Sequence, residues 1–177
     1  MKAVTVYLSS SAGTPVYVEA IEELGRELAR RRLTLVYGGA HRGLMGVLAD
    51  AALAAGGRVV GVIPQALVDY EVAHRGLTEL HVVGTMHQRK AMMFSLADGF
   101  VVAPGGLGTL EEAFETLVGI QLGYHDKPVA VLDIDGFWAP FERFLDHAVS
   151  AGVLSPDVRT LFRTASSAAA ALDLLGT

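Results

Sequence analysis

Residues 99–122 read GFVVAPGGLGTLEEAFETLVGIQL. A short apolar run from Gly99 to Ala103 is followed by a turn rich in glycine, and then by a longer amphipathic stretch from Thr109 to Leu122. Short apolar runs alternate with amphipathic stretches along the rest of the chain, which is the pattern of parallel strands covered by helices. The sequence therefore predicts an α/β fold, with a mainly parallel sheet of about six or seven strands between layers of helices.

The apolar runs give the expected strands: Ala3 to Leu8, Leu33 to Tyr37, Arg58 to Ile63, Glu79 to Val83, Gly99 to Ala103, Pro128 to Leu132 and a weaker one at Thr160 to Thr164. The stretches between them give the expected helices: Thr14 to Arg32, Gly43 to Ala55, Thr85 to Ala97, Thr109 to Leu122, Phe137 to Ala151 and Ser166 to Leu175. The three arginines at 30–32 suit the negative end of the first helix better than a nucleic-acid patch.

Composition narrows the class of protein. The 177 residues, 51% of them hydrophobic, fit a single domain over residues 1–177. A formal net charge of −5 argues against a nucleic-acid partner. Charge-free stretches are broken by proline and glycine, which argues against a membrane span. No cysteine is present, and the six histidines lack H-E-x-x-H spacing, so we expect no metal site and a cytoplasmic protein.

The glycine-rich turn predicts an anion site. Loops that follow parallel strands bind ligands, and a helix that begins there directs free N–H groups and a positive dipole end at an anion. Gly105, Gly106 and Gly108 let the backbone approach phosphate oxygens, and the Thr109 hydroxyl adds a donor. Neither the dinucleotide nor the NTPase fingerprint is complete. The alternative is that this turn, like a similar one from Tyr37 to Gly46, only connects a strand to a helix.

Glu112 has two interpretations. With Thr109 it fits a capping box, and on a helical wheel it lies with Glu111, Glu115 and Gly119 opposite an apolar face, as an ordinary solvated carboxylate would. It also lies one turn beyond the expected phosphate loop, where a carboxylate reaches a sugar held by its phosphate.

Arg89 shares an apolar stripe with Met86, Met93 and Leu96. A permanently charged guanidinium on such a face needs a carboxylate or an anionic ligand, or else extends to water. Lys90 lies on the adjoining face, where lysines are usually exposed.

Two motifs resemble those of the LOG ("Lonely Guy") family. Residues 104–112, PGGLGTLEE, are similar to its P-G-G-x-G-T-x-x-E motif, and residues 86–93, MHQRKAMM, to its M-H-x-R-K-x-x-M motif. Gly38 to Gly46 and Val62 to Glu71 resemble two further stretches of the family. Ala40 replaces a glycine of the family pattern, and Ser9 stands where the family usually has glycine, so the pocket near the first two strands differs in detail.

The resemblance implies a Rossmann-like homodimer without a cofactor. Its members hydrolyse the N-glycosidic bond of a nucleoside monophosphate, an adenosine 5′-monophosphate that commonly carries an N6 substituent, and release the free base and ribose 5-phosphate. Matching motif positions makes Arg89 and Glu112 the catalytic pair. The residues implied to contact substrate are Glu71, Arg89, Lys90, Gly105, Gly106, Gly108 and Thr109.

Our hypothesis is that the loop holds the 5′-phosphate while Glu112 stabilises positive charge on the ribose and aligns or deprotonates water. Arg89 keeps Glu112 ionised or contacts the sugar phosphate. Family members are often mislabelled as lysine decarboxylases, yet none of Lys2, Lys90 and Lys127 lies where a Schiff-base lysine is expected. A nucleotide or molybdenum-cofactor carrier, or a sensor that binds AMP without turnover, is the alternative function.

Overall fold

The polypeptide is described here by a computed structural model that covers residues 1–70 and 72–177. Seven strands form one sheet, and every pairing in it is parallel. The strands are β1 (Ala3–Tyr7), β2 (Thr34–Tyr37), β3 (Val59–Pro64), β4 (Glu79–Val83), β5 (Gly99–Val102), β6 (Val129–Leu132) and β7 (Thr164–Ala165). The predicted α/β class with a parallel sheet is confirmed.

The order of the strands places β1 in the middle of the sheet. The order is β4-β3-β2-β1-β5-β6-β7, so the chain builds one half outward from β1 and then returns to begin the other half with β5. Val4 pairs with Leu35 of β2 on one side and with Gly99 of β5 on the other. The carboxyl ends of β1 and β5 therefore lie at a topological switch point, where open parallel sheets bind their ligands.

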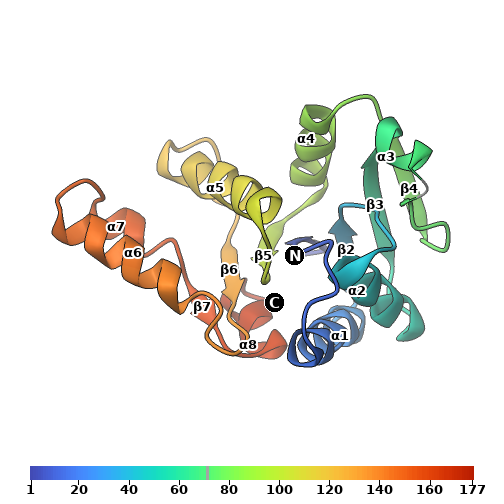
Figure 1. Ribbon diagram of the computed structural model, residues 1–177, viewed down its shortest axis with the longest axis horizontal. Helices are drawn as coiled ribbons and strands as arrows, with labels where there is room; N and C mark the ends of the chain where they lie inside the picture. Colours follow the sequence, from blue (N-terminus) through green and yellow to red (C-terminus); the bar gives the residue numbers. More distant parts are fainter. Residues whose placement is uncertain (71) are drawn as a thin grey trace.

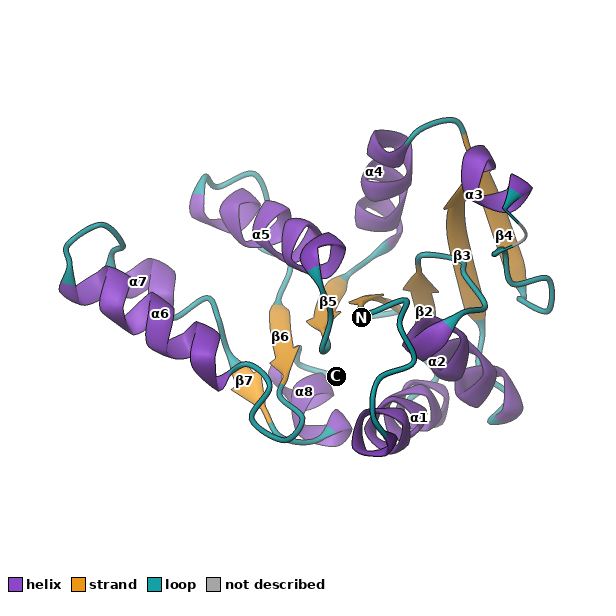
Figure 2. Ribbon diagram, viewed as in Figure 1, coloured by secondary structure: helices purple, strands orange, loops and turns teal. Residues whose placement is uncertain are grey.

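Helices cover both faces of the sheet, as Figure 1 and Figure 2 show. The helices are α1 (Pro15–Arg30), α2 (Gly43–Ala54), α3 (Gln65–Asp69), α4 (Met86–Leu96), α5 (Leu107–Gln121), α6 (Ala139–Ser150), α7 (Pro156–Arg159) and α8 (Ala168–Leu174). Residues of α1, α2 and α8 form one apolar core with the sheet, and residues of α4 and α5 contribute to the other. The inner strands are buried on both faces because each layer of helices covers one of them, whereas the edge strands β4 and β7 are only partly buried.

Alternate residues of the strands supply the two cores. Val4 and Val6 of β1 point to the first core, while Tyr7 packs in the second with Phe100 and Val102 of β5. The hydroxyl of Thr5, on the second face, donates to the carbonyl of Met93 in α4 at 2.9 Å, so this central strand directly positions the helix that carries Arg89.

Helix α1 ends at the arginine cluster, as predicted. Arg31 is its C-cap, and Glu27 binds both Arg30 and Arg31 at 2.6 and 2.7 Å. Arg31 also reaches Asp173 of α8 at 2.7 Å. These arginines therefore form ion pairs at the end of α1, and Arg31 connects this end to α8.

Several expectations about elements need correction; helix α8, for example, begins at Ala168 instead of Ser166. The strand expected at Thr160 to Thr164 is wrong over most of its length, because a proline preceded by a capping serine starts the short helix α7 at Pro156 and only Thr164–Ala165 joins the sheet. The short helices α3 and α7 were not expected. Helix α5 begins at Leu107 instead of Thr109, and helix α6 begins at Ala139 instead of Phe137.

None of the helices in residues 1–70 and 72–177 combines the length and apolarity needed to cross a lipid bilayer.

Candidate active site

The second glycine turn, residues 104–109, forms one wall of a cavity at the switch point; we call these residues the glycine loop. The cavity has a volume of about 290 Å³ and is called the loop cavity below. Its other walls come from the segment after β1 and from α4. Its lining residues include Ser9, Ser10, Ser11, Arg89, Lys90, Gly106, Leu107, Gly108, Thr109 and Glu112.

The start of α5 presents free backbone donors to this cavity. Gly106 is the N-cap and has extended backbone, and no side chain of the described residues caps the helix. A Cβ at Gly106 or Gly108 would meet nothing within 4 Å, so both residues face open space. The first turn of this 15-residue helix therefore has N–H groups and a positive dipole end available for an anion.

Thr109 lies inside the helix, and the capping-box interpretation of Thr109 and Glu112 is wrong. Thr109 is buried, and a Cβ at Gly105 would overlap its hydroxyl. Gly105 is thus required by close packing within the loop, whereas Gly106 and Gly108 leave room beside it. The sequence alone does not distinguish a glycine required by close packing from one that leaves room for a ligand.

A capping box does occur at the start of α4. The Thr85 hydroxyl accepts from the Gln88 N–H at 3.2 Å, and the Gln88 side chain accepts from the Thr85 N–H at 3.1 Å. This reciprocal pair fixes where α4 begins, and Arg89 follows in its first turns. Local sequence thereby sets the register of the helix that carries the cation.

Arg89 is held by backbone carbonyl groups at the ends of two strands. Its Nε donates to the carbonyl of Val62 and its Nη2 to the carbonyl of Gly38, both at 3.2 Å. The side chain is buried, so it does not extend to water, and no carboxylate of the described residues lies within ion-pair distance. Since carbonyl groups solvate the cation without neutralising it, the positive charge remains available to an anionic ligand.

The first glycine turn makes this arrangement possible. A Cβ at Gly38 would overlap the Nη2 atom of Arg89 and would lie 3.0 Å from its Cζ. Ala40, the departure from the family pattern, is buried, and its carbonyl accepts from the Tyr37 hydroxyl at 3.1 Å. The first glycine turn therefore positions the side chain of Arg89. Of the residues of this turn, only Met45 lines the loop cavity.

Glu112 is buried, with 8% of its surface exposed, which excludes the solvated-face interpretation. Burial raises the pKa of its carboxyl to about 7, while Arg89 and Lys90 act in the opposite direction. No described residue hydrogen-bonds this carboxyl; its backbone carbonyl accepts from the Thr116 hydroxyl at 2.9 Å. The acid is thus buried and unpaired, and it shares the loop cavity with Arg89.

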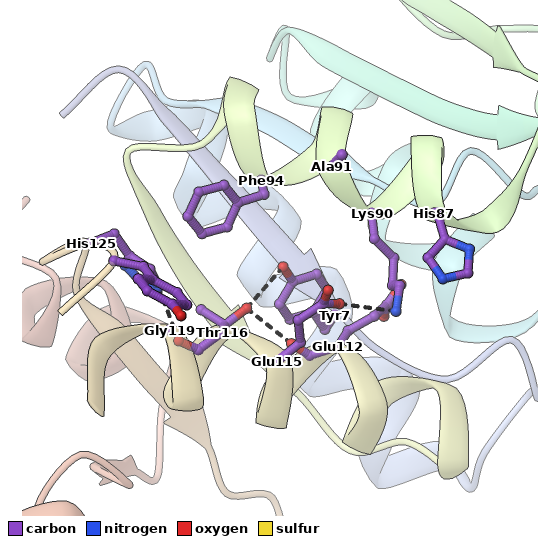
Figure 3. A pocket seen from close by; sticks show the side chains of 11 residues that line it. Tyr7, His87, Lys90, Ala91, Phe94, Glu112, Glu115, Thr116, Gly119 and His125 are labelled. Carbon is purple, nitrogen blue, oxygen red and sulfur yellow. Dashed lines mark hydrogen bonds and ion pairs between the residues drawn. The ribbon is translucent and has the colours of Figure 1, made fainter. Parts of the chain in front are cut away.

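A second cavity, of about 500 Å³, opens on the other side of Glu112. We call it the aromatic cavity, because Tyr7, Phe94 and His125 are in its lining (Figure 3), together with Tyr124. Lys90 and Glu112 line both cavities and therefore lie between them. The complete lining of the aromatic cavity is Tyr7, His87, Lys90, Ala91, Phe94, Glu112, Glu115, Thr116, Gly119, Tyr124 and His125.

Sequence reasoning missed most of this second cavity. Tyr7 comes from the end of β1, and its hydroxyl lies 3.2 Å from that of Thr116 in α5. His125 lies edge-on to Phe94, with ring centroids 4.9 Å apart, and its Nε2 donates to the Thr116 carbonyl at 3.0 Å. The available signal was the position of Tyr7 next to the loop that follows the central strand.

The other predicted residues fall as follows. Lys90 is not simply exposed: its ammonium lies 2.8 Å from Glu111 and 3.0 Å from Glu115. Ser9 accepts from the Ser11 N–H at 3.0 Å through its hydroxyl. Glu71 lies outside the described residues. Within the described residues, no group of three or more His, Asp or Glu side chains is placed to hold a metal ion.

Comparison with solved structures shows a shared fold. The molybdenum cofactor binding protein from Rippkaea orientalis superposes with a TM-score of 0.74 at 21% identity, covering 99% of this chain and 95% of that one. The Moco carrier protein of Chlamydomonas gives a TM-score of 0.67 at 22% identity, covering 99% and 98%.

Sequence comparison gives closer relatives. A cytokinin riboside 5′-monophosphate phosphoribohydrolase of Rhodococcoides fascians is 48% identical and covers 90% of this chain and 81% of its own length. Two others, from Arabidopsis thaliana and Oryza sativa, are 44% identical to this chain, and each alignment covers 94% of it. The alignments cover 79% of the Arabidopsis protein and 69% of the rice protein. The profile of the family described as "Possible lysine decarboxylase" matches residues 45–175. These matches show that the chain belongs to this family, which includes the cytokinin riboside 5′-monophosphate phosphoribohydrolases of the LOG type.

Proposed function

We propose that this chain hydrolyses the N-glycosidic bond of adenosine 5′-monophosphates, including N6-substituted ones, to the free base and ribose 5-phosphate. One observation carries the proposal: a buried and unpaired carboxyl, Glu112, lies between a cavity suited to an anion and a larger aromatic cavity. A nucleoside monophosphate has its anionic group at one end and its aromatic base at the other, with the scissile bond between them. The names of the relatives agree with this assignment.

The phosphate belongs in the loop cavity. The N-terminus of α5 supplies backbone donors, Gly106 and Gly108 leave space, and Arg89 supplies a positive charge that no carboxylate of the described residues neutralises. The Thr109 side chain also lines this cavity. A phosphate at a helix N-terminus beside a guanidinium uses both favourable interactions at once.

The base belongs in the aromatic cavity. Tyr7, Phe94 and His125 offer ring surfaces on which a purine can pack, and the volume of about 500 Å³ leaves room for a substituent. The ribose then passes Glu112, because that residue lines both cavities.

Glu112 performs the chemistry in this arrangement. Loss of the base leaves positive charge on C1′ and the ring oxygen, and a nearby carboxylate stabilises that charge. The leaving nitrogen keeps the electrons of the broken bond, and water adds to C1′ and gives one proton to Glu112. That proton passes on to the leaving nitrogen, so Glu112 is ionised again at the end of the cycle. A carboxyl with a pKa of about 7 is suited to this exchange near neutral pH, and Arg89 favours its ionised form.

The decarboxylase name of the family does not suit the lysines of this chain. Lys90 lines both cavities, but two glutamates hold its ammonium. The Lys127 ammonium donates to the carbonyl of Phe94 at 2.8 Å and lies over the Phe94 ring. Neither amine is free to form a Schiff base.

A carrier function is the weaker alternative. The carriers share the fold at 21–22% identity, which supports architecture alone, whereas the relatives at 44–48% identity are named as hydrolases. A carrier would bind nucleotide and return it intact.

We also propose that the chain acts as a homodimer in the cytoplasm. Helix α6 has no buried residue, and Phe114, Val118 and Leu122 of α5 are 40%, 46% and 56% exposed. A second copy of the chain would cover this apolar surface, since patches of this kind mark interfaces. Light scattering on the parent chain and on Val118→Arg tests the dimer: we expect a dimer and a monomer, respectively, and a monomeric parent contradicts the proposal.

The decisive experiment incubates the protein with AMP and with N6-isopentenyl-AMP, and separates the products by chromatography. We expect free base and ribose 5-phosphate in equal amounts, formed at least 100-fold more slowly by Glu112→Gln. Recovery of intact nucleotide bound to the parent protein would refute hydrolysis and support a carrier or a sensor.

A further inference from the structure

Lys90 is the second cation beside the loop cavity, and two carboxylates of α5 already neutralise it. Its Nζ lies 2.8 Å from Glu111 Oε1 and 3.0 Å from Glu115 Oε2. Both glutamates raise the pKa of Lys90, and Lys90 lowers that of Glu111. The three groups together carry a net charge of about −1.

This ionic group crosses from one cavity to the other. Glu111 lines the loop cavity, Glu115 lines the aromatic cavity, and Lys90 lines both. Figure 3 shows Lys90 extending from α4 towards α5 beside Glu112. Glu111 and Glu115 are one turn apart and would repel each other without the ammonium between them.

Arg89 and Lys90 differ in their ion pairing, and this difference sets how much positive charge a ligand can use. Arg89 hydrogen-bonds only to neutral carbonyl groups and a thioether, and no carboxylate of the described residues forms an ion pair with it. Lys90, in contrast, forms ion pairs with Glu111 and Glu115 of α5. Among the described residues that line the loop cavity there are two cations, of which only Arg89 forms no ion pair. Arg89 balances the charge of a ligand and also favours the ionised form of Glu112 in the same cavity.

We propose that Glu111 and Glu115 are specificity-determining residues that restrict the site to ligands with a single phosphate group. A phosphate monoester carries between −1.5 and −2 charges near pH 7, as estimated for phosphorylated side chains, and is balanced by one guanidinium and the N-terminus of α5. A second phosphate group adds about one more negative charge. Besides Arg89, none of the described residues that line the cavity offers it a cation without an ion pair, and it meets the carboxylate of Glu111.

This inference rests on the proposed function only in placing the phosphate in the loop cavity. It predicts that removing both carboxylates frees Lys90 and makes a second phosphate group acceptable.

The test measures binding of inorganic phosphate and of pyrophosphate by titration calorimetry. The variants are Glu111→Gln, Glu115→Gln and the double variant, and the control is Glu23→Gln, which removes an equal charge from the Arg26 ion pair on α1. We expect the parent to prefer phosphate, and the double variant to shift the ratio of the two affinities towards pyrophosphate by about tenfold. The shift should shrink at high salt, which a merely structural effect would not show.

An unchanged ratio in the double variant, an equal shift in the control, or no phosphate binding by the parent overturns the inference. Cleavage of AMP is measured in parallel on the parent protein. If AMP is cleaved and the ratio does not change, only this inference fails; if the ratio changes and AMP is not cleaved, only the proposed function fails.

Discussion

Replacing Gly38 by alanine should displace the guanidinium of Arg89, which lines the loop cavity. The added Cβ would overlap Nη2 of Arg89 and lie 3.0 Å from Cζ, so the guanidinium must withdraw by about 1 Å or more. The 3.2 Å hydrogen bond to the Gly38 carbonyl is then lost. A hydrogen bond to a charged group contributes about 1.5–3 kcal/mol, and a displacement of about 1 Å in a catalytic site costs about 100-fold in rate.

We therefore expect kcat/KM for AMP to fall about 100-fold in Gly38→Ala, and Tm to fall by roughly 4–8 °C. A double-mutant cycle with Arg89→Ala isolates the cause. If Gly38 acts through Arg89, its substitution costs little further activity once the guanidinium is gone. Parent activity in Gly38→Ala, or the same additional loss in both backgrounds, would refute the reasoning.

The remaining predictions concern Glu112 and the start of α4. Because burial raises the pKa of Glu112 to about 7 and the ionised form is the active one, kcat/KM should rise about tenfold per pH unit below pH 7 and level off above it. Glu112→Gln should lower kcat at least 100-fold with AMP binding retained, as calorimetry would show. Because its pKa is raised, ionised Glu112 lowers the stability of the folded protein; this loss is absent below about pH 4.5 and complete above pH 7. Glu112→Gln removes the loss. We therefore expect the free energy of unfolding, measured in urea, to rise by about 3 kcal/mol at pH 8 and to stay unchanged at pH 4. Thr85→Ala removes the capping box of α4 and should lower stability by about 1 kcal/mol, or Tm by about 3 °C in a thermal melt.

The alternation of apolar runs and amphipathic stretches was sufficient to predict most of the fold. Each strand from β1 to β6 lies within one or two residues of its predicted bounds. The inner strands were found because runs buried on both faces of a parallel sheet are apolar at nearly every position. The two short helices were missed, since a helix of one turn, such as Pro156–Arg159, leaves no periodicity to detect.

The face that α5 buries was predicted only in part. The wheel placed Leu110, Ala113 and Phe114 together, as a core-facing stripe would be. In the structure Ala113 is buried and Leu110 packs against the second core, as the stripe predicts, but Phe114 is 40% exposed. Residues outside this stripe are buried as well: Thr109, Glu112, Thr116 and Gly119. Helical periodicity reports the chemistry of each face but not which neighbour it meets, and this helix turns its polar, small-residue face to the sheet and the cavities.

The site itself was predicted in part. The glycine loop, Arg89, Lys90 and Glu112 all line one cavity, and this arrangement was expected from the motifs. The partners of Arg89 were not foreseen, because backbone carbonyl groups have no sequence signature. The aromatic cavity depends on the approach of β1, α4 and α5, which no local pattern encodes.

The main-chain anchoring of Arg89 has a consequence for how sequences of this type can diverge. Its acceptors belong to Val62 and Gly38, and every amino acid carries the same carbonyl group. Substitutions of the Val62 side chain can therefore accumulate without removing an anchor, whereas any residue larger than glycine at position 38 obstructs the guanidinium. The orientation of Arg89 therefore depends on the path of the backbone at its two acceptors, and on glycine being kept at position 38.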